Sequence, residues 1–323
     1  MWNKIIKKLH IRKVINVSNI AQLLYEQELL KSRIGKMIYG SIEIREKNGK
    51  KYIYVHFRED GISTSKYAGE YSNELYNLII ENNNVVKQYK KMLKNINKQL
   101  GLLQYQSFEL TDKIKINIDL ARRNMVDLIY KQAMLEGVAT TYSDTETIIN
   151  GGKVKNMTAK DISKVVNLKH AWDFILGEGV ITYPTNFVVL SQINSIVEEV
   201  FSYTAGKIRS VPVSIGGSTY IPPLPYEIQV KEDLNNLLSK EPSYEIAIEL
   251  LLYVMKKQLF LDGNKRTAVI YVNHYLISRG LGLIVIPSEL VDEFKVHLIN
   301  YYEDKDEKIK EFIYKKCLTK LEI

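Results

Sequence analysis

The sequence predicts a mainly α-helical protein that is preceded by a small α+β module. Beyond about Leu110, apolar residues recur every three to four positions in successive segments. The first hundred residues instead contain two runs of alternating apolar and polar residues. A composition of 46% hydrophobic and 25% charged residues over 323 positions is typical of globular chains and allows two or three domains. We therefore expect a module over residues 1–106 and a helical domain over residues 107–323.

The first hundred residues predict a helix, a β-hairpin and a second helix, in that order. A serine and an asparagine cap an amphipathic segment over residues 18–34. The two alternating runs flank Asn48-Gly49, which is the strongest short-range signal for a hairpin, and Asp60-Gly61 marks a second turn. Residues 72–103 repeat with helical spacing and carry lysines on their other face, which could pair with another helix.

The remainder of the chain predicts a series of helices with one interruption. Between residues 204 and 225 the helical pattern breaks, and residues 207–220 predict a short β-hairpin with a Gly216-Gly217 turn, which prolines then end. The expected helices cover residues 111–136, 158–177, 187–204, 226–239, 243–259, 263–280, 287–302 and 305–320.

The net charge of +8 is concentrated in the first third of the chain. Residues 1–100 contain 19 Lys and Arg against 9 Asp and Glu, whereas the remaining residues contain 26 against 28. A basic segment can bind nucleic acid or an acidic protein surface. We favour a solvated helix face over nucleic acid as the reason for these charges, because no nucleic-acid motif accompanies them.

Several classes of protein are excluded by composition. The single cysteine, Cys317, rules out an intrachain disulfide or a cysteine-based metal site. The densest apolar stretch, residues 246–255, is too short to cross a bilayer, and the first residues lack a signal-type apolar run. We expect a cytoplasmic protein without membrane association. Its abundance of Ile, Lys, Asn and Tyr suggests an AT-rich bacterial genome, and a homo-oligomer is compatible with the sequence.

The most informative segment is the run Gln258–Ala268, which lies between two apolar helical stretches. It places an acidic residue, a glycine, an amide and two cations at the expected start of a helix. One interpretation is structural, with Asp262 as cap, Gly263 in the turn and the cations in water. However, cations at a helix N-terminus oppose the helix dipole, and an anionic ligand would resolve this conflict. Backbone N–H groups, cations and one carboxylate together are suited to hold a polyphosphate and its metal ion.

This run resembles the His-Pro-Phe-x-Asp-Gly-Asn-Gly/Lys-Arg signature of the Fic/Doc family, whose core is called the Fido fold. Two further segments are similar to parts of that core. Residues 203–220 resemble the flap hairpin of the family, and residues 167–172 resemble the helix that opens the core. The resemblance covers roughly residues 110–300, in the same order. It implies a mainly α Fido core with a β-hairpin flap.

The resemblance also implies an activity and a role for each matching residue. Fic proteins transfer AMP or phosphate from a nucleotide, such as ATP with Mg²⁺, to a protein hydroxyl. Asp262 matches the residue that holds Mg²⁺, and Arg266 matches the arginine that contacts the phosphates. Backbone groups of the loop cradle the anion, at positions matching Gly263, Asn264 and Lys265. The flap docks a protein acceptor as an added strand, at positions matching Ser214, Ile215, Gly216, Gly217 and Ser218.

Three positions depart from the family pattern. Gln258 stands at the position of the histidine base, and an amide cannot accept a proton near neutral pH. Lys265 replaces the usual glycine, and Val269 replaces the second arginine of adenylylating members, which makes the run more similar to Doc. Two hypotheses remain: a Fic-type transferase with Gln258, Asp262, Asn264 and Arg266 in the active site, or an inactive nucleotide- or protein-binding module.

Glu136-Gly137 resembles the inhibitory Ser/Thr-x-x-x-Glu-Gly/Asn motif of the family, with Gln132 replacing the hydroxyl residue. In those proteins the glutamate pairs with the second arginine and blocks the nucleotide. Here Val269 cannot supply that partner, so we expect Glu136 near the phosphate pocket, facing Lys265 or Arg266. A helix C-cap at Gly137 is the structural alternative.

Overall fold

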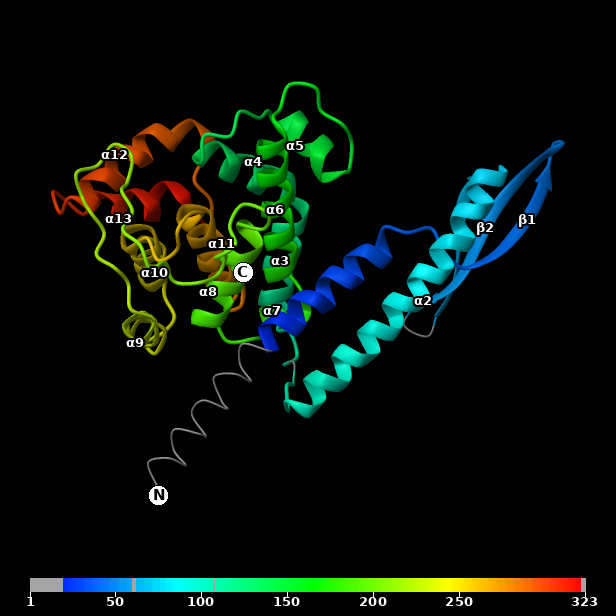
Figure 1. Ribbon diagram of the computed structural model, residues 1–323, viewed down its shortest axis with the longest axis horizontal. Coiled ribbons are helices and arrows are strands. Elements are labelled where there is room, and N and C mark those ends of the chain that lie inside the picture. Colours follow the sequence, from blue (N-terminus) through cyan, green and yellow to red (C-terminus); the bar gives the residue numbers. More distant parts are fainter. Residues whose placement is uncertain (1–19, 60–61, 107, 321–323) are drawn as a thin grey trace, which may run out of the picture. The chain divides into compact units, whose positions relative to one another are not determined.

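The computed structural model describes residues 20–59, 62–106 and 108–320, which belong to two compact units. One unit is Gln22–Gln106, and the other comprises the residues before Gln22 together with those after Gln106. Figure 1 labels the elements of both units, and each unit is described separately below.

The smaller unit is built around a three-stranded antiparallel sheet. Within this unit residues 22–35 are helical, and three strands follow in the order β1 (Ser41–Lys47), β2 (Lys50–Glu59) and β3 (Ile62–Glu70). The predicted hairpin at Asn48-Gly49 is confirmed, whereas the predicted cap at residues 18–19 and the turn at residues 60–61 lie outside the described residues. The predicted helix after the sheet is α2 (Asn73–Leu102), and the Ser72 hydroxyl caps it by accepting a hydrogen bond from Leu75 N.

One face of this sheet packs against α2. Ile53 and Val55 of β2 and Ile79 of α2 are fully buried and form the centre of a small core. Ile42, Phe57 and Leu75 pack against them. Because side chains alternate across a strand, Tyr52, Tyr54 and His56 point to the opposite face of the sheet.

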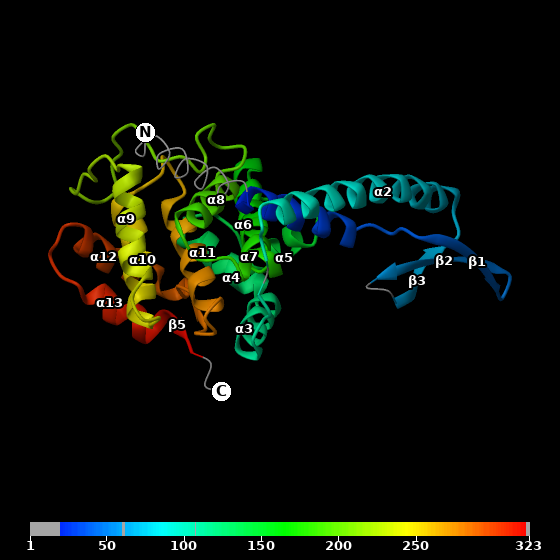
Figure 2. The ribbon, with the colours of Figure 1, turned by 90° about the horizontal axis from the view of Figure 1, so that it is seen from below.

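The larger unit is helical (Figures 1 and 2). A two-stranded antiparallel ladder joins β4 (Leu283–Ile284) to β5 (Leu318–Thr319), η1 (Ser288–Leu290) precedes α12, and η2 (Ile313–Cys317) is a π-helical turn. The α-helices of this unit are α3 (Asp112–Arg123), α4 (Met125–Leu135), α5 (Tyr142–Ile149), α6 (Ala159–Ile175), α7 (Glu178–Ile181), α8 (Phe187–Val197), α9 (Glu227–Leu238), α10 (Tyr244–Lys257), α11 (Asn264–Ile277), α12 (Val291–Tyr302) and α13 (Lys308–Phe312).

Helix α11 forms the centre of the larger unit. All of its residues except Lys265 are buried, and it packs against α6, α8 and α10. A helix that is enclosed on every side is held mainly by apolar burial, which fixes the position of its first turn. The Gln258–Ala268 run therefore starts from a rigid element.

The mainly α fold with a small α+β module is confirmed, but three of the predicted helices differ from their predictions. The predicted helix over residues 111–136 is broken at Asn124 into α3 and α4. The predicted helix over residues 187–204 ends at Val197, and a left-handed backbone at Val200 (φ 65°) follows. The predicted helix over residues 305–320 is replaced by α13, the π-helical turn and β5.

The predicted β-hairpin over residues 207–220 is wrong. These residues are all described, and they form a loop that contains no strand. Its backbone carbonyls are satisfied differently: the buried Arg209 side chain donates hydrogen bonds to the carbonyls of Val211, Pro222 and Pro223. A side chain here replaces the ladder bonds that a hairpin would supply. The tight turn at Gly216-Gly217 is present, and Ser218 N donates to Ile215 O across it.

Within the described residues, no helix has the length and apolar character that crossing a membrane would require.

Candidate functional site

The loop between α10 and α11 is shaped by Asn264, the first residue of α11. Its Oδ1 accepts a hydrogen bond from Phe260 N at 2.9 Å, and its Nδ2 donates to Phe260 O at 2.8 Å. Nδ2 also lies 3.1 Å from Gln258 Oε1, to which it donates. Phe260 is buried and anchors the loop in the core. Asn264 therefore supports the fold of the loop, because its polar atoms are engaged within the chain.

The first turn of α11 presents free backbone donors. Among the described residues, no hydrogen bond is donated by the N–H groups of Asn264, Lys265 or Arg266. These groups lie at the positive end of the helix dipole, where an anion is stabilised. Asp262 accepts a 2.6 Å bond from Gly263 N, and its side chain is 73% exposed, so a metal ion could reach this carboxylate.

Arg266 is buried in the middle of a cluster of carboxylates. Its Nη2 lies 2.8 Å from Glu198 Oε1 and 3.6 Å from Asp262 Oδ1, and its Nε lies 3.6 Å from Glu136 Oε2. Nevertheless, Nε and Nη1 are buried without a hydrogen-bond partner among the described residues. Burying unpaired donors of a charged group is costly, so this position is suited to an additional hydrogen-bond acceptor.

Glu136 faces both cations of the run, in line with the expectation for its position. Its Oε1 lies 3.6 Å from Lys265 Nζ, and its Oε2 lies 3.6 Å from Arg266 Nε. It follows the last residue of α4, and Gly137 continues the chain with a left-handed φ of 71°. Gly137 thus allows the chain to turn away after α4, while the Glu136 side chain reaches the start of α11.

Glu198 is a site residue that the sequence analysis missed. Glu198 is the first residue after α8, and its side chain is almost fully buried beside Gly263. A Cβ atom at Gly263, whose φ is 73°, would lie only 2.6 Å from Glu198 Oε1. Burial raises the pKa of Glu198 to about 7, and the charges of Asp262 and Glu136 act in the same direction, whereas Arg266 opposes the rise. No sequence signal distinguishes this glutamate from Glu199 beside it.

The cluster has an unusual charge balance for an anion site. Glu136, Glu198 and Asp262 surround the cations Lys265 and Arg266. With all side chains ionised, the carboxylates exceed the cations by one. A phosphate group, itself an anion, is therefore favoured in this cluster only when a carboxylate moves away or takes up a proton.

Gln258 is fixed between the loop and the segment that precedes it. It has a left-handed backbone with φ 46°, and its Nε2 donates to Met255 O at 2.6 Å. The buried Arg209 donates from Nε to Gln258 O at 2.5 Å, and Arg209 N donates to Leu259 O. A non-glycine residue in this conformation costs roughly 1–2 kcal/mol. Arg209 and Asn264 therefore hold Gln258 in a strained position.

The predicted docking segment, residues 214–218, lies in the exposed loop and contacts α12 at its far end. Glu303 Oε1 accepts hydrogen bonds from Ser218 Oγ at 3.0 Å and from Thr219 N at 2.7 Å. A salt bridge to Lys305, together with these bonds, lowers the pKa of Glu303 to about 2. Arg209, which donates to Gln258 O and to the carbonyls of Val211, Pro222 and Pro223, ties both flanks of this loop to the Gln258 region.

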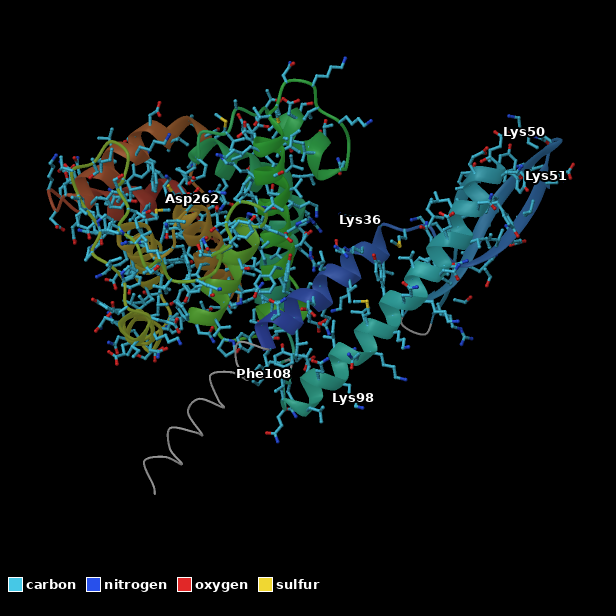
Figure 3. The ribbon with its side chains drawn as sticks, viewed as in Figure 1. Lys36, Lys50, Lys51, Lys98, Phe108 and Asp262 are labelled. Atoms are coloured by element: carbon cyan, nitrogen blue, oxygen red, sulfur yellow. The ribbon has the colours of Figure 1, made fainter. Side chains whose placement is uncertain are left out.

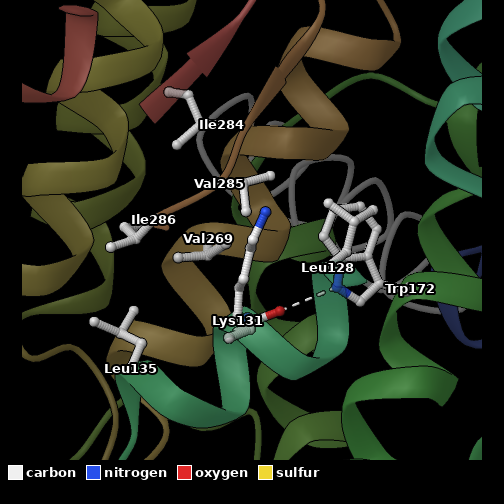
Figure 4. Close-up of a pocket in the computed structure, with 9 residues that line it drawn as sticks. Leu128, Lys131, Leu135, Trp172, Val269, Ile284, Val285 and Ile286 are labelled. Carbon is white, nitrogen blue, oxygen red and sulfur yellow. Dashed lines mark hydrogen bonds between the residues drawn. The ribbon is translucent and has the colours of Figure 1, made fainter. Parts of the chain in front are cut away.

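Position 269 faces an apolar cavity of about 10 Å³ rather than the carboxylate cluster. Figure 4 shows Val269 among Leu128, Leu135, Trp172 and Ile286. The dashed line in this figure joins Trp172 Nε1 to Gln132 Oε1, and Gln132 Nε2 donates to Arg266 O at 2.8 Å. Gln132 thus links α4 and α6 to the first turn of α11. The cavity has room for about one water molecule and for no larger ligand.

His274 offers no replacement for a base at position 258. His274 is fully buried in α11, where its ring contacts Thr185 Oγ1 and Val180 O. Burial lowers its pKa to about 4. Among the described residues, no group of three histidine, cysteine or acidic side chains could hold a metal ion.

Comparison with known proteins places a family domain on these helices. Residues 187–276 match the model of the Fic/DOC family, so the chain contains a Fic/DOC family domain that begins at α8 and includes all of α11 except its last residue. None of the curated proteins compared with the chain is significantly similar to it.

Solved structures with the same fold include Fic-1 from C. elegans, which is 18% identical with a TM-score of 0.50 over 75% of this chain and 73% of that one. A Fic domain containing signaling protein from Bacteroides thetaiotaomicron is 22% identical, with a TM-score of 0.49 over 58% and 75% of the two chains. A Fic family protein from Desulfovibrio desulfuricans is 16% identical, with a TM-score of 0.49 over 65% and 73%. At these identities the Fic-1 likeness establishes a shared fold alone.

Proposed function

We propose that this protein is a Fic-type transferase that uses a nucleotide to transfer AMP or phosphate to an acceptor, and that Glu136 and Glu198 hold its site in a resting state. The proposal rests mainly on Arg266. This buried cation has side-chain donors without hydrogen-bond partners, and it lies beside the free N–H groups at the start of α11. The Fic/DOC match over residues 187–276 supports it.

The donors around α11 fit the phosphates of a nucleotide such as ATP. The free N–H groups of residues 264–266 and the unpaired Nε and Nη1 of Arg266 are suited to phosphate oxygens. Lys265 would add a second positive charge. Asp262, with its exposed carboxylate, would hold Mg²⁺. The ion would neutralise phosphate charge during transfer.

The chemistry of transfer must proceed without a histidine base. An acceptor oxygen attacks phosphorus, the bond to the leaving phosphate breaks, and the leaving group departs with the bonding electron pair. A hydroxyl acceptor would have to lose its proton, and the Gln258 amide cannot take it. We therefore infer that the acceptor oxygen is already ionised, as in a phosphate or carboxylate, and that Gln258 fixes the loop geometry. Val269 in place of a second arginine favours transfer of the terminal phosphate, as in Doc.

The resting state follows from the carboxylates around Arg266. Glu198 lies at 2.8 Å from Arg266 Nη2, and Glu136 lies near its Nε, so both compete with phosphate for the same cation. Activation would then require the Glu136 carboxylate to leave or Glu198 to become neutral. The acceptor segment would dock along residues 214–218, whose backbone lies in an exposed loop without strand partners.

A second function, nucleotide or protein binding without turnover, is favoured by the state of Gln258. Its amide is engaged on both sides, with Met255 O and Asn264 Nδ2, so it has no free group to offer an acceptor. This alternative predicts the same phosphate contacts but no transferred product.

One labelling experiment separates the two functions. The wild type, Asp262→Ala, Glu136→Gly and Gln258→His proteins are incubated with Mg²⁺, a cell lysate and ATP labelled in the α- or γ-phosphate. A transferase gives a labelled product that depends on Asp262 and increases in Glu136→Gly. Labelling by Gln258→His alone supports the binding module. If wild type and Asp262→Ala give the same amount of labelled product, neither the transferase with Asp262 in its site nor the binding module without turnover is correct.

A further inference from the structure

The exposed face of the β1–β3 sheet carries a cluster of tyrosines. Tyr67 of β3 pairs with Tyr54 of β2, and their ring centroids lie 5.5 Å apart. Tyr52 lies 6.2 Å from Tyr67. Because Ile53 and Val55 fill the opposite face, these tyrosines are not needed for the core with α2. We call Tyr52, Tyr54 and Tyr67 the tyrosine face.

Cations surround the tyrosine face. Arg45 of β1 is paired with Tyr52 in the register, and its guanidinium lies 4.4 Å from the centroid of the Tyr54 ring. Lys47 and Lys50 lie opposite each other at the turn end of the strands. Figure 3 labels Lys50 at this end of the sheet. Two acidic residues lie on the same face and share these cations, Glu43 with Arg45 and His56, and Glu70 with Lys50, so a phosphate would have to compete with them for Arg45 and Lys50.

The same sheet borders an open hollow of about 370 Å³ that is lined by basic side chains. Its basic residues are His56, Arg58 and Lys90, and its lining contains no acidic residue. Ser41 and His56, which are opposite each other in the register, connect this hollow to the solvent face of β1 and β2. The hollow is therefore suited to an anionic group, and it continues the row of polar and aromatic side chains.

Exposed tyrosine rings beside cationic side chains favour one class of ligand. Acidic peptides would use the cations but not the rings, whereas a purely apolar partner would avoid the lysines and arginines. Single-stranded nucleic acid uses both, because bases stack on aromatic side chains while phosphates pair with cations along the strand. A duplex hides its bases and would leave the tyrosines without a role. Tyr67 is 53% exposed, so its ring is accessible to a base.

We propose that the tyrosine face and the adjoining basic hollow form a binding site for single-stranded nucleic acid, with bases stacking on the tyrosines and a phosphate in the hollow. From the sequence alone, a solvated helix face was favoured over nucleic-acid binding as the reason for the basic residues. The strand register favours nucleic-acid binding instead, because it brings Tyr52, Tyr54 and Tyr67 together with Arg45 on one surface. The site lies within the smaller unit, so it stands independently of the function proposed for α11.

Fluorescence anisotropy of the full chain with a labelled oligothymidine or oligouridine of about 12 nucleotides tests the proposal. We expect binding that weakens with salt, with a slope of about −0.7 per phosphate in a plot of log affinity against log salt. A matched duplex and an oligoglutamate peptide should bind at least about tenfold more weakly at the same salt concentration. Equal binding of the duplex or of the peptide overturns the assignment of the ligand, and absence of oligonucleotide binding at low salt overturns the site.

Substitutions then test the tyrosine face itself. Tyr67→Ala should weaken oligonucleotide binding by roughly 5- to 150-fold, the range expected for loss of one stacked base, whereas Tyr67→Phe should retain affinity within about twofold. Tyr226→Ala, which removes an exposed tyrosine of the larger unit, is the matched control and should have no effect. Equal affinity of Tyr67→Ala and wild type contradicts the proposal.

A second measurement guards against a folding effect of Tyr67→Ala. Ultraviolet cross-linking of the bound oligonucleotide to the wild-type chain, followed by peptide mass spectrometry, should locate the cross-links within residues 41–70. Cross-links confined to other parts of the chain would rule out this face.

Discussion

Arg266 Nη2 lies 2.8 Å from Glu198 Oε1, and both side chains are almost completely buried. The pair links the end of α8 to the first turn of α11, so it joins two segments that lie 68 positions apart in the sequence. A buried charge pair is costly to form, and removing one partner leaves the other charge unpaired. Glu198 therefore both supports the start of α11 and competes for the cation that a phosphate would use.

The first prediction concerns the pH dependence of anion binding at α11. Because the pKa of Glu198 is raised to about 7 by burial, its carboxyl group becomes neutral as the pH falls through 7 and releases Arg266. Calorimetry with sulfate, whose charge is constant over this range, should show tighter binding at about pH 6 than at about pH 8. The charges that face Glu198 are those of Arg266, Asp262 and Glu136. In Glu198→Gln, binding should be tight at both pH values.

The same pKa shift has a consequence for stability. The pKa of the Glu198 carboxyl is about 7 in the folded chain, against an ordinary value of 4.5 when the group is exposed, so the folded state holds more protons between these values. The free energy of unfolding should therefore decrease as the pH rises through this window. Urea unfolding of wild type and Glu198→Gln should show a smaller decrease in the variant. An identical pH dependence in both proteins would show that Glu198 is not the group responsible.

The second prediction concerns Glu136 as a competitor for phosphate. Glu136→Gln keeps the size of the side chain but removes the charge that lies 3.6 Å from both Lys265 and Arg266. Nucleotide affinity, measured by calorimetry with ATP and Mg²⁺, should increase about 3- to 30-fold, which corresponds to roughly 0.7–2 kcal/mol. Glu146→Gln, an exposed acidic position on α5, is the control and should not change the affinity. If Glu136→Gln binds the nucleotide with the same affinity as the wild type, Glu136 does not compete with phosphate for Lys265 and Arg266.

Sequence patterns could predict the elements whose signals are local. The Asn48-Gly49 turn, the Ser72 cap and the apolar stripes of α10 are each specified by residues close to one another in the chain. Gly263 and Asn264 were likewise recognisable as the start of α11, because a glycine with positive φ and a short amide side chain suit the entry to a helix.

Features that depend on distant contacts could not be predicted in the same way. The expected hairpin over residues 207–220 failed because Arg209 binds carbonyls on both sides of the loop, and nothing in its sequence neighbourhood indicates those partners. Glu198 was missed for a similar reason, because its role arises only when α8 places it beside Gly263 and Arg266. The tyrosine face required the strand register, which joins β2 to β3.

The third prediction concerns Arg209 as the anchor of the 204–225 loop. Arg209→Met fills a similar volume but leaves the carbonyls of Gln258, Val211, Pro222 and Pro223 without their donor. Urea unfolding should show a loss of about 2–4 kcal/mol, and proteolysis should cut the loop faster than in the wild type. Arg209→Lys should lose less, since it retains a charged donor. A loop as resistant as that of the wild type in Arg209→Met would contradict the anchoring role.

The final prediction tests whether Glu198 occupies the space beside Gly263. Gly263→Ala should destabilise the chain for two reasons: a φ of 73° is unfavourable for alanine, and the new Cβ would lie 2.6 Å from Glu198 Oε1. Gly151→Ala is the matched control, because Gly151 has a φ of 79° but no atom within 4 Å of its would-be Cβ. Urea unfolding should therefore show a larger loss for Gly263→Ala than for Gly151→Ala.

A double-mutant cycle isolates the part of this loss that is due to Glu198. In a Glu198→Ala background the contact is gone, so Gly263→Ala should cost about 0.5–2 kcal/mol less than in the wild type, while the cost of Gly151→Ala should not change. This comparison cancels the destabilisation that Glu198→Ala itself causes by leaving Arg266 short of a partner. If Gly263→Ala costs the same in both backgrounds, Glu198 does not fill the entrance to α11, and its carboxylate cannot be the group that excludes phosphate there.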